Sequence, residues 1–120
     1  MKCEKLDVWK RSCRISVEIY KYFSNLKDYG FRDQITRSGL SIASNLAEGM
    51  EKESSKEKVR FIEISKGSAA ELITQIYIGM EIDYIDKQTG SAWIKELNEI
   101  LKMLSGLKKN LKGVNNEYKS

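Results

Sequence analysis

The sequence contains no histidine, no proline and only two cysteines among its 120 residues. Without histidine the chain lacks the commonest general base, the commonest metal ligand and every Ser-His or Cys-His nucleophile pair. Without proline nothing in the sequence interrupts long helices. Cys3 and Cys13 are too few and too far apart for a zinc knuckle or a redox pair. We therefore predict no catalytic residues, no metal site and no cofactor.

Long apolar runs are missing as well. No segment approaches the roughly 20 apolar residues that span a bilayer, so we expect no membrane partner. The N-terminal residues lack the apolar core of a signal peptide, which predicts a cytoplasmic protein. A hydrophobic content of 41% with 32% charged residues is typical of a soluble globular chain. We expect one domain over residues 1–113 and a flexible C-terminal tail over residues 114–120.

Charge is scarce in two segments of this otherwise highly charged sequence. Residues 34–50 carry only Arg37 and Glu48, and residues 67–80 carry only Glu71. Both segments have helical patterns, but a surface helix of a monomer needs a charged outer side. We infer that a partner covers part of both segments, and the first candidate is a second copy of the chain.

Apolar residues recur at helical spacing in four segments, which we expect to form helices. The first three cover residues 7–26, 31–48 and 55–85, and the fourth follows a turn at residues 86–90 and ends near residue 113. The fourth has the most regular apolar seam: Trp93, Leu97, Ile100, Leu104, Leu107 and Leu111. Short connections favour antiparallel neighbours, so the pattern predicts an all-α, up-down-up-down four-helix bundle.

Local signals predict where these helices begin and end. Ser54 and Glu57 have capping-box spacing at the start of the third helix. Gly30 closes a predicted turn at residues 27–30, where glycine adopts a left-handed conformation at little cost. Gly49 is a plausible stop for the second helix.

Small residues lie inside the second and third helices. Gly39 and Gly67 each cost about 1 kcal/mol relative to alanine in a helix, so a close approach of backbones is the expected compensation. We predict that the second helix packs tightly on the third through Gly39, Gly67 and Ser68. The alternative is a binding groove floored by exposed backbone.

Two carboxylates interrupt the uncharged segments. Glu48 and Glu71 need positive or hydrogen-bonding partners, which Arg37, Ser41 and Asn45 offer. We predict a structural polar network of these five residues. The alternative is an acid-base pair or a divalent metal site, but the pattern supplies no third acidic ligand.

Basic residues give the chain a net charge of +4 and gather towards its two ends. The candidates for phosphate contact are Lys10, Arg14, Lys95, Lys102, Lys108, Lys109 and Lys112. Lys95, Lys102 and Lys109 recur every seven residues, which places them on one side of a helix about 10 Å apart. This lysine ridge is either an ordinary solvated face or a track for phosphates, and self-association would multiply its field.

Three segments in this order resemble a known family. They are residues 30–37 (GFRDQITR), residues 41–49 (SIASNLAEG) and residues 67–72 (GSAAEL), and the opening residues 6–9 (LDVW) fit as well. The sequence resembles the bacterial four-helix-bundle family that includes proteins encoded by intervening sequences in 23S ribosomal RNA genes. The resemblance covers nearly the whole chain. Ser24 departs from it, since relatives often have proline there.

The resemblance implies a four-helix protomer that assembles into a homopentameric barrel. A related branch comprises accessory proteins of diversity-generating retroelements, which partner a reverse transcriptase and are thought to bind nucleic acid. The family carries no established catalytic residues, so the resemblance transfers none.

Three functions follow from the residues and the resemblance, in order of preference. The first is a non-enzymatic homo-oligomeric bundle that associates with RNA or another nucleic acid through Lys and Arg contacts. The expected partners are further copies of the chain, and RNA or a nucleic-acid-processing protein. The second is a protein-protein interaction scaffold without nucleic-acid binding. The third is an enzyme, which would need Glu48 and Glu71 to bind a metal ion or a substrate.

Overall fold

The computed structural model describes the backbone of residues 1–119 and the side chains of residues 1–113. The predicted tail, residues 114–120, therefore lies outside the fully described residues. The elements are a short 3₁₀ helix η1 (Lys2–Lys5) and the helices α1 (Asp7–Tyr22), α2 (Tyr29–Met50), α3 (Ser55–Glu81) and α4 (Lys87–Lys119). The described part contains four α-helices and no strand, as the sequence predicts.

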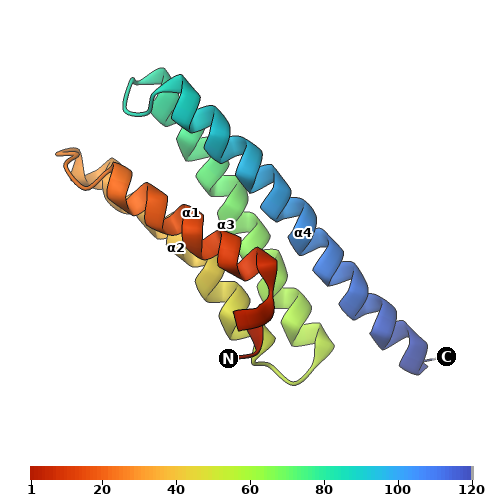
Figure 1. Ribbon diagram of the computed structural model, residues 1–120. Coiled ribbons are helices and arrows are strands. Elements are labelled where there is room, and N and C mark those ends of the chain that lie inside the picture. Colours follow the sequence, from red (N-terminus) through yellow and green to blue (C-terminus); the bar gives the residue numbers. More distant parts are fainter. Residues whose placement is uncertain (120) are drawn as a thin grey trace.

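The four helices lie side by side in an elongated molecule with extents of 54 × 22 × 21 Å (Figure 1). Each helix packs on the next, most extensively α2 on α3, and α1 also contacts α4. They enclose one apolar core that includes Ile15, Ile35, Ile62 and Leu97. The predicted α4 seam is confirmed, because Trp93, Leu97, Ile100 and Leu104 are buried and Leu107 and Leu111 pack against the core.

The start of α2 differs from the prediction because an aspartate, not a glycine, controls it. The Asp28 carboxylate accepts a hydrogen bond from the backbone N–H of Phe31 at 3.1 Å, which starts the helix at Tyr29. Gly30 lies inside this first turn, and no glycine in the described residues has a positive φ. α1 ends earlier than predicted, at Tyr22 rather than near residue 26.

The connection between α3 and α4 is also shifted. α3 begins as predicted, since Ser54 Oγ accepts from the Glu57 N–H at 3.1 Å. It ends at Glu81, and Asp83 adopts a left-handed conformation with φ 63°. The predicted turn at residues 86–90 is instead the start of α4, because Asp86 accepts a hydrogen bond from the Thr89 N–H at 2.8 Å.

Gly49 does not stop α2 but lies buried within it, where α2 crosses α3. A Cβ at this position would lie 2.4 Å from Phe61 Cβ and 3.3 Å from Phe61 Cγ. Glycine is needed here for close approach of the two helices and not for a turn.

Gly49→Ala is expected to lower the free energy of unfolding by about 1–3 kcal/mol, because Phe61 Cβ is fixed to the α3 backbone and the helices must separate. Gly106→Ala is the matched control. Gly106 is exposed within α4 and a Cβ there meets nothing within 4 Å, so alanine should stabilise the helix by up to about 1 kcal/mol. Urea unfolding at one protomer concentration measures both. Equal stability of the two variants would contradict a tight crossing at Gly49.

Aromatic side chains join the α1–α2 connection to the α3–α4 connection, and both connections lie at the same end of the molecule (Figure 1). Trp93 of α4 lies edge-on to Tyr22 of α1, with ring centroids 5.1 Å apart, and its centroid is 6.2 Å from that of Phe23. Phe31 of α2 contacts both Phe23, at 5.8 Å, and Tyr84, at 5.2 Å. Edge-to-face pairs at these separations are favourable. This aromatic cluster closes one end of the core.

Each of the two capping aspartates accepts a tyrosine hydroxyl from the other helix pair. Tyr84 Oη donates to Asp28 Oδ2 at 2.8 Å, and Tyr22 Oη donates to Asp86 Oδ2 at 3.2 Å. Hydrogen bonds from the backbone N–H groups of Phe31 and Thr89, respectively, and then from side-chain hydroxyls lower the pKa values of both aspartates below the usual range. The same two carboxylates therefore start α2 and α4 and tie the two helix pairs together.

Candidate nucleic-acid interface

The predicted lysine ridge is present on α4. Burial of Leu97 and Leu104 turns the opposite side of α4 outward, and Lys95, Lys102 and Lys109 lie exposed there. The Lys102 side chain is 78% exposed, and its contact with Glu99 Oε1 is long, at 3.9 Å. An exposed ion pair of this kind contributes little. The three ammonium groups are therefore accessible to a ligand.

Two further predicted cations of α4 differ in their surroundings. Lys108 is half-buried, and its Nζ lies 2.5 Å from Glu63 Oε1 of α3. The Lys108 hydrogen bond holds the pKa of Glu63 below its usual range, so this pair is an internal contact between α3 and α4. Lys112 is exposed. Lys108 therefore does not belong to the accessible set.

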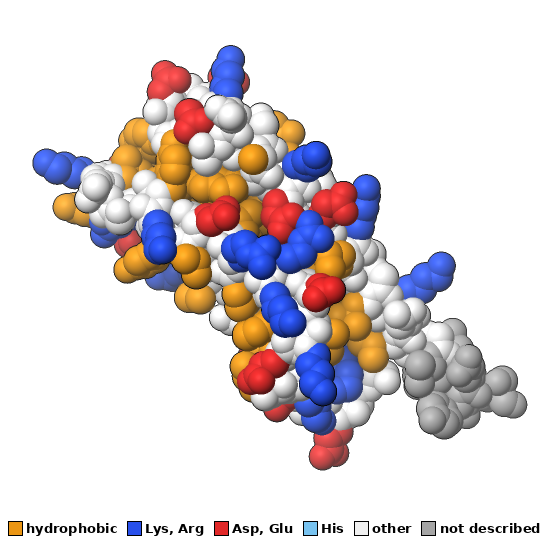
Figure 2. All heavy atoms as spheres, in the orientation of Figure 1, with side chains coloured by type: hydrophobic (Ala, Val, Ile, Leu, Met, Phe, Trp, Pro, Cys, Tyr) orange, Lys and Arg blue, Asp and Glu red, His pale blue; other side chains and the backbone are white. Residues whose placement is uncertain are grey.

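The predicted cations of α1 lie on a different helix from the ridge. Lys10 and Arg14 are exposed, and Arg14 lines a groove of about 520 Å³ between α1 and α4 together with Glu18 and Glu96. On the face shown in Figure 2, Lys and Arg side chains are interspersed with Asp and Glu. The seven predicted basic residues thus come from two helices, and one of them, Lys108, is paired with Glu63.

One residue of this region was not predicted. Arg11 forms a bidentate ion pair with Glu96 of α4 and also donates from Nη1 to Met103 Sδ at 3.4 Å. The Arg11 hydrogen bond is the main cause of a lowered pKa at Glu96. This pair joins α1 to α4. The charges of Arg11 and Glu96 therefore neutralise each other, although the sequence alone gives no sign that they are paired. No short-range pattern connects positions so far apart in the chain.

The predicted polar network forms only in part. Ser41 Oγ lies 2.9 Å from Ser68 Oγ, and Asn45 Nδ2 donates to Ser41 Oγ at 2.8 Å, so three polar groups meet between α2 and α3. The other three members, Arg37, Glu48 and Glu71, are exposed. Within the described side chains they form no hydrogen bond or ion pair with one another. The predicted five-residue network is therefore corrected to a contact of Ser41 and Asn45 with Ser68, and the three charged members are exposed.

The glycine prediction is corrected as well. Gly39 is buried, but the nearest atom to its Cβ position is Ser16 Cα of α1, at 3.7 Å, so it packs on α1 and not on α3. Gly67 is exposed, and a Cβ there would meet nothing within 4 Å. Only Ser68 faces α2, through its contact with Ser41. Gly67 therefore has no packing role among the residues that the structure describes.

The two cysteines are poorly suited to nucleophilic chemistry. Cys3 is buried, Cys13 is half-buried, and both are free thiols. Burial raises the pKa of each thiol, which keeps it protonated near neutral pH. Among the described residues, no three Asp, Glu or Cys side chains come close enough together to hold a metal ion. No helix in the described part is both long enough and apolar enough to cross a membrane.

Comparison with known proteins finds similarity in sequence and in fold. The sequence model of the family described as 23S rRNA-intervening sequence protein matches residues 4–106. A crystal structure from Bacteroides thetaiotaomicron VPI-5482, described as a protein with unknown function from the S23 ribosomal protein family, superposes with a TM-score of 0.79. The two chains are 25% identical, and the match covers 85% of this chain and 98% of the other. No curated protein matches the chain.

Proposed function

The chain belongs to the 23S rRNA-intervening sequence protein family, and from this premise we propose that it is a non-enzymatic, cytoplasmic protein that associates with itself and with RNA. Its helices run up-down-up-down in an antiparallel bundle, and its copies close into a homopentameric barrel. The contacts between α2 and α3 support the antiparallel order: Ser41 meets Ser68, Ile42 meets Ser65, and Gly49 meets Phe61. Residue numbers thus rise along one helix as they fall along the other.

RNA association is supported above all by the lysine ridge of α4. Lys95, Lys102 and Lys109 present three accessible ammonium groups at intervals of about 10 Å along a rigid helix. Such groups bind phosphates without reading bases, so the expected recognition follows the RNA backbone and its shape. Repetition of the ridge in each copy of an oligomer multiplies the number of phosphate contacts.

Binding of fluorescently labelled single-stranded RNA is expected to weaken steeply with salt. Each phosphate contact contributes a slope of about −0.7 in a plot of log affinity against log salt. Three contacts from one chain predict a slope of about −2, and engagement of several copies makes it steeper. Fluorescence anisotropy between 50 and 300 mM NaCl measures the slope, with a DNA strand of the same length in parallel. A slope near zero, or no binding at 50 mM, would contradict the proposal.

A scaffold for other proteins is the second candidate, and exposed apolar side chains favour it. Tyr20, Leu40 and Ile78 are each half or more exposed although large and apolar. Patches of this kind mark protein interaction sites. The scaffold is supported if a stoichiometric protein partner remains bound after nuclease treatment, at high salt, and to a variant whose lysine ridge is reversed in charge.

A further inference from the structure

We propose that the groove between α1 and α2 of one copy receives the outward side of α3 of a second copy, so that copies join head to tail. This inference rests on the self-association in the proposed function and assigns its two surfaces. The α1–α2 groove is lined by Ser16, Val17, Tyr20, Lys21, Asp33, Thr36, Arg37 and Leu40. The α3 ridge consists of Ile64, Gly67, Glu71, Thr74, Ile78 and Glu81, all of them exposed.

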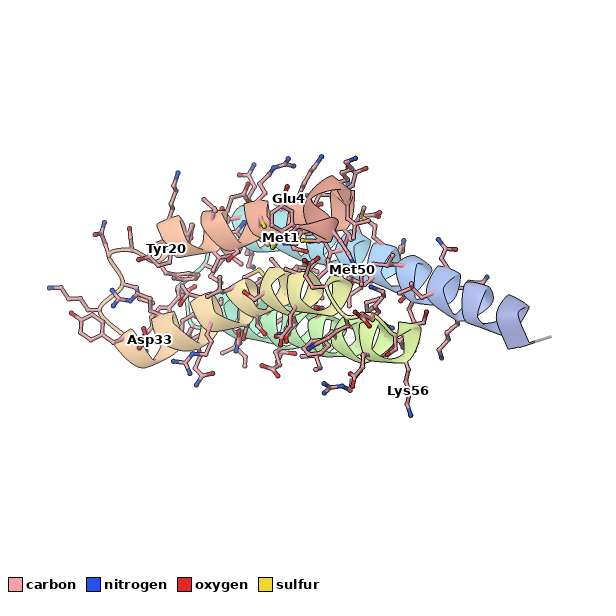
Figure 3. The ribbon with its side chains drawn as sticks, turned by 90° about the horizontal axis from the view of Figure 1, so that it is seen from below. Met1, Glu4, Tyr20, Asp33, Met50 and Lys56 are labelled. Atoms are coloured by element: carbon pink, nitrogen blue, oxygen red, sulfur yellow. The ribbon has the colours of Figure 1, made fainter. Side chains whose placement is uncertain are left out.

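The α1–α2 groove is concave and carries unusually exposed apolar side chains. Its volume is about 520 Å³. Tyr20 is 70%, Leu40 59% and Val17 52% exposed, although all three are large. Figure 3 shows Tyr20 of α1 and Asp33 of α2 at the same end of the molecule, on the two helices that form the groove. Covering these three side chains would remove substantial apolar area from water.

The α3 ridge has the spacing of a helix that packs on another helix. Its members alternate steps of three and four residues, the seam pattern of coiled coils. Ile64 and Ile78 are large, exposed and apolar. Gly67, the ridge member that follows Ile64, has no side chain. Glycine in the middle of a helix destabilises the helix relative to alanine, and no contact among the described residues requires it at position 67. Close approach of a second copy to the α3 backbone would account for a glycine at this position.

The charges of the two surfaces are complementary. The α1–α2 groove holds the cations Lys21 and Arg37 beside one acid, Asp33. The α3 ridge holds only acids, Glu71 and Glu81. Arg37 and Glu71 form no ion pair within the described chain, so both are available to a neighbour. Complementary charges of this kind favour one orientation and register over others.

The two surfaces differ, which determines the symmetry of the assembly. A groove that binds a ridge is a heterologous contact, and such contacts repeat from copy to copy until they close into a ring or grow as a filament. The groove is formed in part by α2, and the ridge belongs to α3, which packs on α2. Head-to-tail joining is thus compatible with the closed ring of the proposed function, whereas a groove that paired with a second groove would stop at a dimer.

The test uses one charged substitution on each surface. Leu40→Glu in the groove and Ile78→Glu on the ridge should each convert the oligomer to a monomer, as measured by light scattering coupled to gel filtration. Mixed in equal amounts, the two variants should form a heterodimer, because one intact groove and one intact ridge remain. Tyr29→Glu, at an exposed aromatic residue outside both surfaces, should leave the mass unchanged. Circular dichroism checks that each variant folds.

The outcomes separate the surfaces from self-association itself. A wild-type monomer would contradict the oligomer of the proposed function. A wild-type oligomer that persists in Leu40→Glu or Ile78→Glu would overturn the assignment of surfaces alone. Two monomeric variants that do not combine would exclude head-to-tail joining. If a variant fails to fold, charge exchange serves instead: Arg37→Glu and Glu71→Arg should each lower the oligomer fraction at least tenfold, and the double variant should restore it.

Discussion

Reversal of charge at both Lys102 and Lys109 is expected to lower the affinity for RNA about 1,000-fold at low salt. An ion pair at 4 Å in bulk water contributes about 1 kcal/mol, and a glutamate also replaces attraction by repulsion, so each reversal costs about 2 kcal/mol. Two reversals cost about 4 kcal/mol, which corresponds to roughly a factor of 1,000 in affinity. Anisotropy titration of Lys102→Glu with Lys109→Glu measures the loss. The salt slope should also become shallower, since fewer counterions are released.

The matched control changes net charge equally but at the other end of the molecule. Lys27 lies between α1 and α2, and Lys87 opens α4. Lys87 is eight residues from Lys95 and fifteen from Lys102, or about 12 Å and about 22 Å along the helix, and both separations exceed the Debye length of about 10 Å at 0.1 M salt. Lys27→Glu with Lys87→Glu should therefore bind RNA nearly as well as the wild type. Equal losses in both double variants would indicate a general effect of net charge and no role for the ridge.

Local signals predicted those parts of the fold that depend on neighbouring residues alone. The Ser54 cap and the α4 seam were both predictable, because capping acts over three residues and the seam over single turns. Two of the errors about helix ends came at glycines. Gly30 and Gly49 have the appearance of helix ends, yet an aspartate controls the first position and contact with Phe61 controls the second. The second reason lies on another helix, where sequence spacing gives no information.

The site was predictable in its exposed part and not in its pairings. The spacing of Lys95, Lys102 and Lys109 placed them on one side of α4, and the structure shows them exposed there. The ion pairs of Lys108 with Glu63 and of Arg11 with Glu96 join residues far apart in the chain. Such pairs depend on how helices cross, which periodicity does not encode. For this reason the sequence overestimates the number of free cations.

The scarcity of charge in the middle of the chain has two separate causes in the structure. Part of α2 and α3 is uncharged because it lies in the core, as Ile42 and Leu72 do. Another part is uncharged although it is exposed, as Leu40 and Ile78 are. Burial within one chain explains why the core positions are uncharged, but it does not explain why the exposed positions are uncharged. These exposed positions are what the proposed head-to-tail contact would cover.

Trp93→Ala is expected to lower the free energy of unfolding by about 3–5 kcal/mol, the range for removal of a buried aromatic side chain. Trp93 is 5% exposed, contacts Tyr22 and Phe23, and donates from Nε1 to Glu18 Oε2 at 3.2 Å. The loss is a large share of a total stability of about 5–15 kcal/mol, because the cavity would open where the two helix pairs meet.

Trp9→Ala is the control for the Trp93 prediction, since Trp9 is only half-buried at the other end of α1 and should cost distinctly less. Urea unfolding followed by circular dichroism compares the two variants at one protomer concentration, because the stability of an oligomer depends on concentration. In Trp93→Ala the tyrosine hydroxyls of Tyr22 and Tyr84 should also lose their fixed positions, since the rings that carry them pack in the same cluster. Equal losses at Trp93 and Trp9 would show that the aromatic cluster does not hold the two helix pairs together.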